Sequence, residues 1–108
     1  MIKIDVVKSD KLYDINFTLQ DANGAAFDLT NNTQILLKSQ QQGSTSLKFT
    51  GTMAVVGAPT LGTCKYTVQT TDFDAAGQYY AEIEVTYSGG KVVTFPDIVI
   101  SVLPELPR

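Results

Sequence analysis

Strict alternation of apolar and polar residues is the feature that most limits what this chain can fold into. The clearest case follows Gly77: every second residue from Tyr79 to Tyr87 is apolar or aromatic, and those between, except Tyr80, are polar. Successive side chains of a β-strand point to opposite faces, so this pattern predicts a strand with one buried face and one solvated face. The segments 2–6 and 13–20 repeat the pattern, and helical spacing is nearly absent. We therefore predict an all-β chain.

Turn-forming residues divide the chain into about seven such strands at intervals of roughly ten residues, the number and spacing of a β-sandwich. Further strands are expected near 35–38, 47–56, 61–69 and 91–103, and the polar, glutamine-rich segment 39–46 is expected to be a loop. In the third of these strands, Cys64, Tyr66 and Val68 form the inward set. Pro96 cannot donate a ladder hydrogen bond, so it belongs on an edge or at a bulge.

The turn before the Tyr79 strand narrows the fold class further. Acidic residues and Gly77 lead into Tyr79, as at the corner of an immunoglobulin-like sandwich where a tyrosine stands two residues before the second core cysteine. Ala81 holds that cysteine position here, and Cys64 is the only cysteine. We predict an immunoglobulin-like antiparallel β-sandwich of about seven strands without an internal disulfide. Residues 1–103 would form one domain and 104–108 an extended C-terminal tail.

Composition and charge exclude several classes of partner. Hydrophobic residues make up 44% of the 108 and charged residues 18%, so the chain should fold. The net charge is −3 and the lysines are scattered, which gives no basic face for nucleic acid or an anionic membrane. We find no secretory signal or apolar run long enough to span a bilayer. We therefore expect synthesis and folding in a reducing cytosol, or release from one by lysis.

The residues needed for enzymatic chemistry are largely missing. The chain has no histidine, so catalytic triads and dyads that depend on it are impossible. Cys64 is expected to be a buried, inert thiol. Glu82 and Glu84 stand two apart on one strand, but a glycosidase pair faces across a cleft, and these would lie on an open sheet face. We predict that the chain is not an enzyme.

Metal and cofactor sites are also not expected. The segment 21–24 begins like a calcium loop but lacks the later ligands and the closing glutamate. Asp72 and Asp74 could bind a cation with Asp97 only if the fold brought them together, and turn formation explains them better. Ser88-Gly89-Gly90 precedes a strand rather than a helix, so it is not a phosphate loop.

A protein interface is the remaining kind of site. Tyr80 has the outward parity of its strand, beside Glu82 and Glu84. An exposed aromatic residue among polar neighbours is typical of protein contact surfaces. We hypothesise an interface formed by this face and the C-terminal tail, comprising Tyr80, Glu82, Glu84, Leu103, Leu106 and Arg108.

The order of these features resembles the immunoglobulin-like N-terminal domain of phage baseplate upper proteins, and related small domains of phage tails and necks. The matching pieces, between about Ile2 and Val102, are the N-terminal alternating strand, Gly24 followed by Phe27-Asp28-Leu29-Thr30, a glycine-bounded hairpin, and the segments 62–68 and 77–82. In that family the domain usually anchors longer proteins that reach toward the receptor. This chain ends at Arg108, so we expect a docking module without a receptor-binding arm.

The resemblance implies a noncatalytic structural protein of a phage or prophage tail, baseplate or neck. It would act through contacts with other phage structural proteins, or with further copies of itself. It would be made in the bacterial cytoplasm and located in the virion. The alternative is a carbohydrate- or cell-surface-binding β-sandwich module, although the chain lacks tryptophan, the residue most used to stack on sugars. An enzyme that depends on Glu82 or Glu84 is the third hypothesis.

Overall fold

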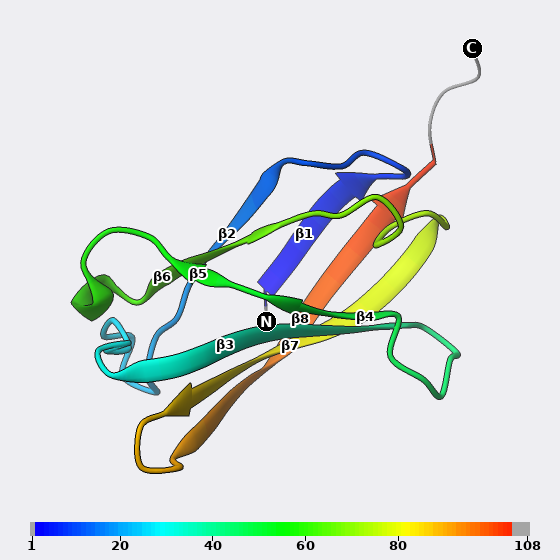
Figure 1. Cartoon of the computed structure of the whole chain (residues 1–108). Helices are drawn as coiled ribbons and strands as arrows, with labels where there is room; N and C mark the ends of the chain where they lie inside the picture. Colours follow the sequence, from blue (N-terminus) through cyan, green and yellow to red (C-terminus); the bar gives the residue numbers. More distant parts are fainter. Residues whose placement is uncertain (1, 105–108) are drawn as a thin grey trace.

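The computed structural model describes residues 2–104 and consists of two packed β-sheets (Figure 1). The larger sheet has the strand order β1-β8-β7-β3-β4, and the smaller has the order β2-β6-β5. The strands are β1 (Ile2–Val7), β2 (Asp14–Thr18), β3 (Asn32–Gln41), β4 (Phe49–Thr52), β5 (Ala54–Val55), β6 (Thr63–Thr67), β7 (Gly77–Tyr87) and β8 (Val92–Leu103). This is the predicted immunoglobulin-like sandwich.

Strand pairing in residues 2–104 is antiparallel with one exception: β1 runs parallel to β8, with Ile4 opposite Ile100. The prediction of a wholly antiparallel sandwich missed this pair. The two strands stand at opposite ends of the chain, so no turn connects them and no local pattern signals their direction. β1 consequently forms one edge of the larger sheet.

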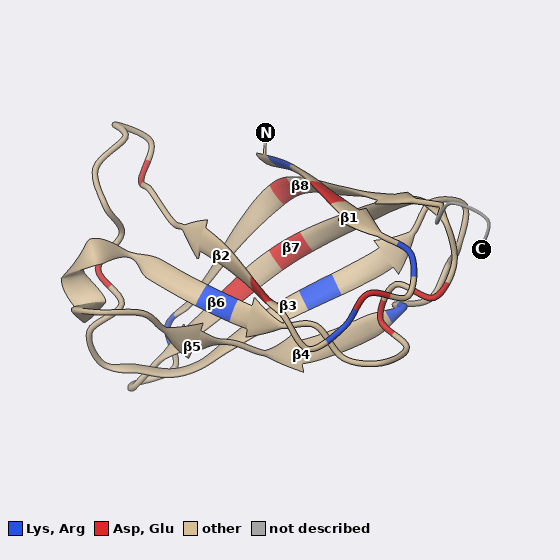
Figure 2. Cartoon of the chain, turned by 90° about the horizontal axis from the view of Figure 1, so that it is seen from above, with Lys and Arg blue, Asp and Glu red and all other residues tan. Residues whose placement is uncertain are grey.

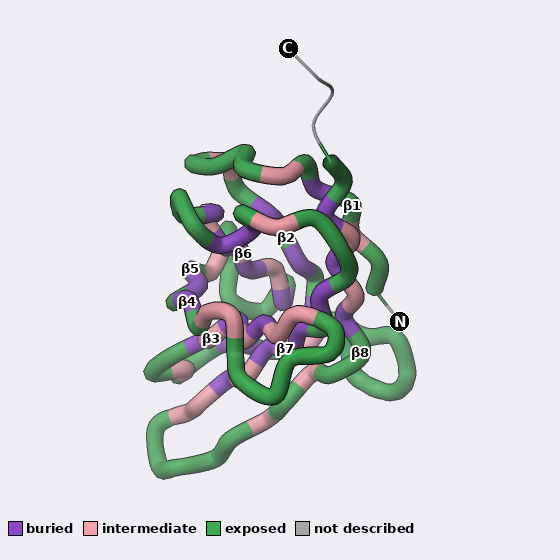
Figure 3. The backbone as a smooth tube through the Cα atoms, turned by 90° about the vertical axis from the view of Figure 1, so that its right-hand side faces the viewer, coloured by how far each residue is buried: buried purple, intermediate pink, exposed green. Residues whose placement is uncertain are grey.

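The core follows the alternation in the sequence (Figure 3). In β7, Tyr79, Ala81, Ile83 and Val85 are buried, and the predicted inward residues of β6, Cys64 and Tyr66, are buried with Val68. An aromatic cluster joins the two sheets near the β7 corner: the ring of Phe49 stacks on Tyr66, and Phe73 contacts Phe49 and Tyr79 edge to face. Burial of rings this large contributes much of the hydrophobic stabilisation of a small domain.

The tyrosine corner is present. The Tyr79 hydroxyl donates a hydrogen bond to the Ala75 carbonyl oxygen at 2.8 Å, which ties the start of β7 to the preceding turn. The position two residues later, Ala81, is buried without a disulfide partner, and Cys64 is a buried free thiol.

Pro96 lies at a bulge, one of the two positions predicted for it; the other, an edge strand, is wrong, because β8 lies between β1 and β7. The register of β7 against β8 passes from Ala81–Ile98 to Ile83–Phe95, so Pro96 and Asp97 together face Glu82. Asp97 adopts a left-handed conformation (φ 67°). The extra residue explains why the inward set of β8 changes from odd positions before Pro96 to even positions from Ile98 onward.

The region from 35 to 56 differs most from the sequence prediction. Ser39–Gln41 extends β3 instead of opening a loop, because the buried Ser39 continues the inward set of Ile35 and Leu37. The expected strand 47–56 is divided at the buried Met53, where the chain passes from the larger sheet (β4) to the smaller one (β5). The expected strand 61–69 begins with a 3₁₀ turn, η1 (Pro59–Leu61), before β6.

Candidate interaction surface

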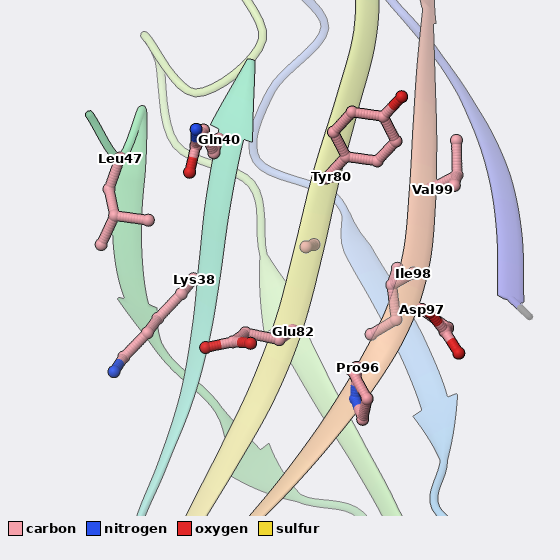
Figure 4. Close-up of a pocket in the computed structure, with 10 residues that line it drawn as sticks. Lys38, Gln40, Leu47, Tyr80, Glu82, Pro96, Asp97, Ile98 and Val99 are labelled. Carbon is pink, nitrogen blue, oxygen red and sulfur yellow. The ribbon is translucent and has the colours of Figure 1, made fainter. Parts of the chain in front are cut away.

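A shallow groove of about 380 Å³ lies on the outer face of the larger sheet (Figure 4). Its lining comes from β3, β7, β8 and the β3–β4 loop. We call it the outer groove, and it is lined by Lys38, Gln40, Leu47, Tyr80, Ala81, Glu82, Pro96, Asp97, Ile98 and Val99. Segments far apart in the sequence therefore contribute to one surface.

Three apolar side chains mark the upper part of the groove. Tyr80 is 48% exposed and Leu47 is 52% exposed, and Val99 is half-buried. In Figure 4 these side chains stand on one side of the sheet, with Tyr80 between Leu47 and Val99. Exposed aromatic and aliphatic groups that share a concave surface are the usual anchors of protein interfaces.

The β3–β4 loop holds Leu47 in place through its polar residues. The Gln40 side-chain amide donates to the Ser44 carbonyl oxygen, and the Ser46 amide donates to the Ser44 hydroxyl at 3.1 Å. The Lys48 amide then donates to the Ser39 carbonyl oxygen at 2.6 Å, which returns the chain to the sheet. The serine- and glutamine-rich composition of this segment thus organises a compact loop.

Charged residues of both signs lie on β3, β7 and β8, the strands that line the groove (Figure 2). The Lys38 ammonium donates to the Glu84 carboxylate at 2.9 Å, and this hydrogen bond raises the pKa of Lys38 above its ordinary value. Glu82 is half-buried on the same face, opposite Lys38 in the β3–β7 register. The two glutamates and the lysine therefore form a polar border beside Tyr80.

The bulge in β8 forms the wall of the groove that lies across β7 from Lys38 and Gln40 of β3. Pro96 and Asp97 are exposed and face Glu82 across the β7–β8 pair. A bulge re-aims the side chains of its strand, which is why such irregularities often accompany functional surfaces.

The structure brings together some of the predicted interface residues. Tyr80 and Glu82 line the outer groove, and Glu84 lies beside it on the same face, paired with Lys38. Leu103 is exposed at the end of β8 and does not line the groove. Leu106 and Arg108, with the tail from 105 on, lie outside the described residues.

Sequence reasoning missed Leu47 and Val99. Leu47 was assigned to a strand, and only the path of the β3–β4 loop brings it near Tyr80. Pro96 carried a signal, since a proline inside an alternating strand predicted either an edge strand or the bulge that is found here.

Of the candidate catalytic groups, Cys64 is buried and Glu84 is paired with Lys38. Burial raises the pKa of the Cys64 thiol to about 11, so the nucleophilic thiolate is disfavoured. Glu84 is paired with Lys38, and Glu82 shares its sheet face.

The acidic turn organises the backbone. The Asp72 carboxylate is buried and accepts hydrogen bonds from the Tyr66 hydroxyl at 2.5 Å and the Gln69 backbone N–H at 2.8 Å. Asp74 pairs with Lys48 at 2.8 Å, and this hydrogen bond lowers the pKa of Asp74. Within residues 2–104, no three histidine, cysteine, aspartate or glutamate residues gather into a group that could hold a metal ion.

The family model of the BppU N-terminal domain matches residues 2–106. The chain belongs to this family. Its members are phage baseplate upper proteins, so this chain is a phage baseplate structural domain. A solved structure of murine CRIg is also similar, with a TM-score of 0.41 and 10% sequence identity over 96% of this chain and 92% of that one. No curated protein matches significantly.

Among residues 2–104, no helix has the length and apolar character to cross a membrane.

Proposed function

We propose that this chain is a noncatalytic structural component of a phage or prophage particle that acts through protein–protein contacts. Its partners would be other structural proteins of the tail, baseplate or neck, and its location the virion. Membership of the BppU N-terminal domain family supports the structural role.

The observation that carries the contact role is the outer groove. Tyr80 and Leu47 expose apolar surface in a hollow on the outer face of the larger sheet. Burying these side chains against a partner would remove apolar area from water, worth about 25 cal/mol for each Å². The Lys38–Glu84 pair and Glu82 would fix the orientation of the partner, because border charges favour one register over others.

Leu103 extends this proposal to the end of β8. Its exposed side chain begins the segment that was predicted to join the interface with Leu106 and Arg108.

The carbohydrate-binding alternative receives less support. Sugar sites use exposed flat aromatic rings, and Tyr80 is the only large aromatic side chain exposed among residues 2–104. A single exposed ring within a charged border suits a protein partner better.

The test combines particle composition with one matched pair of variants. Phage particles are produced with the wild-type chain, with Tyr80→Ser, or with Leu61→Ser, and purified by density. Leu61 is the control, because it is 56% exposed and lies on η1, away from the outer groove.

Quantitative mass spectrometry then compares this chain with a known tail protein in the same particles. We expect a fixed stoichiometry for the wild type and Leu61→Ser, and at least a tenfold loss of the Tyr80→Ser chain, about the effect of one interface hot spot. Absence of the wild-type chain from abundant particles would overturn the structural role. Equal incorporation of both variants would overturn the role of the groove alone.

A further inference from the structure

The free edge of β1 offers a second surface, separate from the outer groove. β1 is the terminal strand of the larger sheet, and its neighbour on the inner side is β8 (Figure 1). An edge strand presents backbone N–H and C=O groups that can pair with another strand.

The hydrogen bonds at the end of β1 show which of its residues direct their backbone groups away from β8. The Lys8 amide donates to the Leu103 carbonyl oxygen at 2.8 Å, so Lys8 directs its backbone groups toward β8. Successive strand residues direct these groups to opposite edges, which leaves those of Lys3, Asp5 and Val7 facing away from β8. Consistently, the Val7 carbonyl oxygen accepts from the Asp10 amide outside the sheet, at 3.1 Å.

The side chains of the same residues carry complementary charges. Lys3 and Asp5 are both exposed and share the outer face, and neither joins an ion pair with another residue of the described chain. An antiparallel pair of β1 strands with its twofold axis at Ile4 sets Lys3 of each copy opposite Asp5 of the other. Shifting the axis to Lys3 or Asp5 instead sets like charges opposite, which is destabilising.

The inner face of β1 also fits this arrangement. Ile2 is 37% exposed although its parity is inward, and it borders a hollow of about 350 Å³ with Thr18 and Phe95 among its walls. Ile4 is only half-buried. With the twofold axis at Ile4, Ile4 stands opposite Ile4 of the second copy, and Ile2 stands opposite Val6 of the second copy. These contacts would cover apolar side chains of β1 that are only partly buried in the single chain.

The other edge strands lack this self-complementarity. An antiparallel pair of β2 strands about a twofold axis at the centre of β2 would set Asp14 opposite Thr18, which gives no charge pair. The Asp14 carboxylate is also already engaged by Thr67 at 2.6 Å and Lys65 at 3.5 Å. β4 is uncharged and β5 has two residues.

We propose that β1 pairs antiparallel with β1 of a second copy of this chain, about a twofold axis at Ile4, so that two five-stranded sheets become continuous. Lys3 of each copy then forms backbone hydrogen bonds and a side-chain ion pair with Asp5 of the other copy, because the backbone N–H and C=O groups of both residues face away from β8. This self-association goes beyond the proposed function and does not depend on the outer groove. The contact is smaller than a standard interface, so a dissociation constant between micromolar and about millimolar is expected.

Sedimentation velocity on the tag-free chain, at concentrations up to about 1 mM, tests the proposal. The variants are Asp5→Lys, Lys3→Asp and the double charge exchange K3D/D5K, with Asp10→Lys and Lys11→Asp as controls. The controls make the same charge changes at exposed residues outside β1.

We expect a concentration-dependent dimer for the wild type. Each single β1 variant should raise the dissociation constant about tenfold or more, because two opposite-charge pairs become like-charge pairs. The double exchange and both controls should stay within about threefold of the wild type. A chain that remains monomeric throughout, single β1 variants that dimerise normally, or a double exchange as weak as either single would overturn the proposal.

Amide hydrogen exchange on the wild type gives a second readout that needs no variant to fold. Protection of the Lys3 and Asp5 amides should increase with protein concentration in step with the dimer. A wild-type dimer that leaves these two amides unprotected would place the contact elsewhere and overturn the proposal.

Discussion

At the scale of single residues, tyrosine hydroxyls hold the turns onto the sandwich. Tyr79 donates to the Ala75 carbonyl oxygen, Tyr66 to the Asp72 carboxylate, and Tyr87 to the Asp28 carbonyl oxygen at 2.8 Å. Each ring lies in or against the core while its hydroxyl reaches a loop. Tyrosine suits these positions because it combines a large apolar body with one polar end.

Removing the corner hydroxyl gives a test at this scale. Tyr79→Phe keeps the ring in the core but leaves the Ala75 carbonyl without its donor, so the free energy of unfolding should fall by about 1 kcal/mol. Tyr80→Phe is the matched control, since it removes the same atom from the exposed neighbour. Urea unfolding followed by circular dichroism measures both. Equal stability of Tyr79→Phe and the wild type would show that the corner bond contributes nothing.

At the scale of elements, close approach between the sheets depends on one glycine of β4. A Cβ atom placed on Gly51 would lie 2.0 Å from Cε1 of the Tyr66 ring, which stacks on Phe49 and reaches Asp72. No other residue fits here without moving that ring. The glycine thus permits β4 to pass close to β6 just before the chain changes sheets at Met53.

We expect Gly51→Ala to lower the free energy of unfolding by about 1–3 kcal/mol, the usual cost of overpacking a core. The displaced ring would also weaken its bond to Asp72. Thr52→Ala, at the exposed next position, is the control and should change stability by no more than about 0.5 kcal/mol. Thermal and urea unfolding of both variants decide the point, and equal effects at the two positions would contradict it.

The elements also divide into those that the sequence could predict and those that it could not. Alternation predicted the inward sets of β6 and β7, because these depend on local parity. The missing backbone donor of Pro96 limited its place to an edge strand or a bulge, and the structure has the bulge. The segment 47–56 divides into two strands where the chain passes from one sheet to the other at the buried Met53, which is a tertiary arrangement. The parallel direction of β1 and the position of Leu47 in the outer groove likewise depend on contacts between residues far apart in the sequence, so no local pattern predicts them.

At the scale of the whole molecule, the buried and paired titratable groups determine how stability depends on pH. We expect the free energy of unfolding to be highest near neutral pH and to fall at both acid and alkaline pH. On the acid side, Asp74 beside Lys48, Asp14 beside Thr67 and Asp28 beside Thr30 have pKa values below their ordinary range. Each carboxylate favours folding above the pKa of about 4 that it has in the unfolded chain. This contribution is lost as pH falls through the lower pKa of the folded state.

On the alkaline side the first group to lower stability as pH rises is Cys64, because its ordinary pKa is lower than that of the tyrosines. Burial raises the pKa of its thiol to about 11 from an ordinary value of 9.0, so the unfolded chain ionises first and stability falls as pH rises from about 9 through 11. Burial likewise raises the pKa of Tyr66, which adds to the decline above about pH 10. Each unit of difference between the folded and unfolded pKa corresponds to about 1.4 kcal/mol.

Cys64→Ala separates the thiol from the tyrosines. The variant should be less stable at neutral pH, because it leaves a small cavity, but it should lose less stability than the wild type between about pH 9 and 11. Urea unfolding at pH 7, 9, 10 and 11 gives the two slopes directly. Parallel slopes would mean that the thiol ionises equally well in the folded chain, and hence that the two sheets separate enough at Cys64 to admit water.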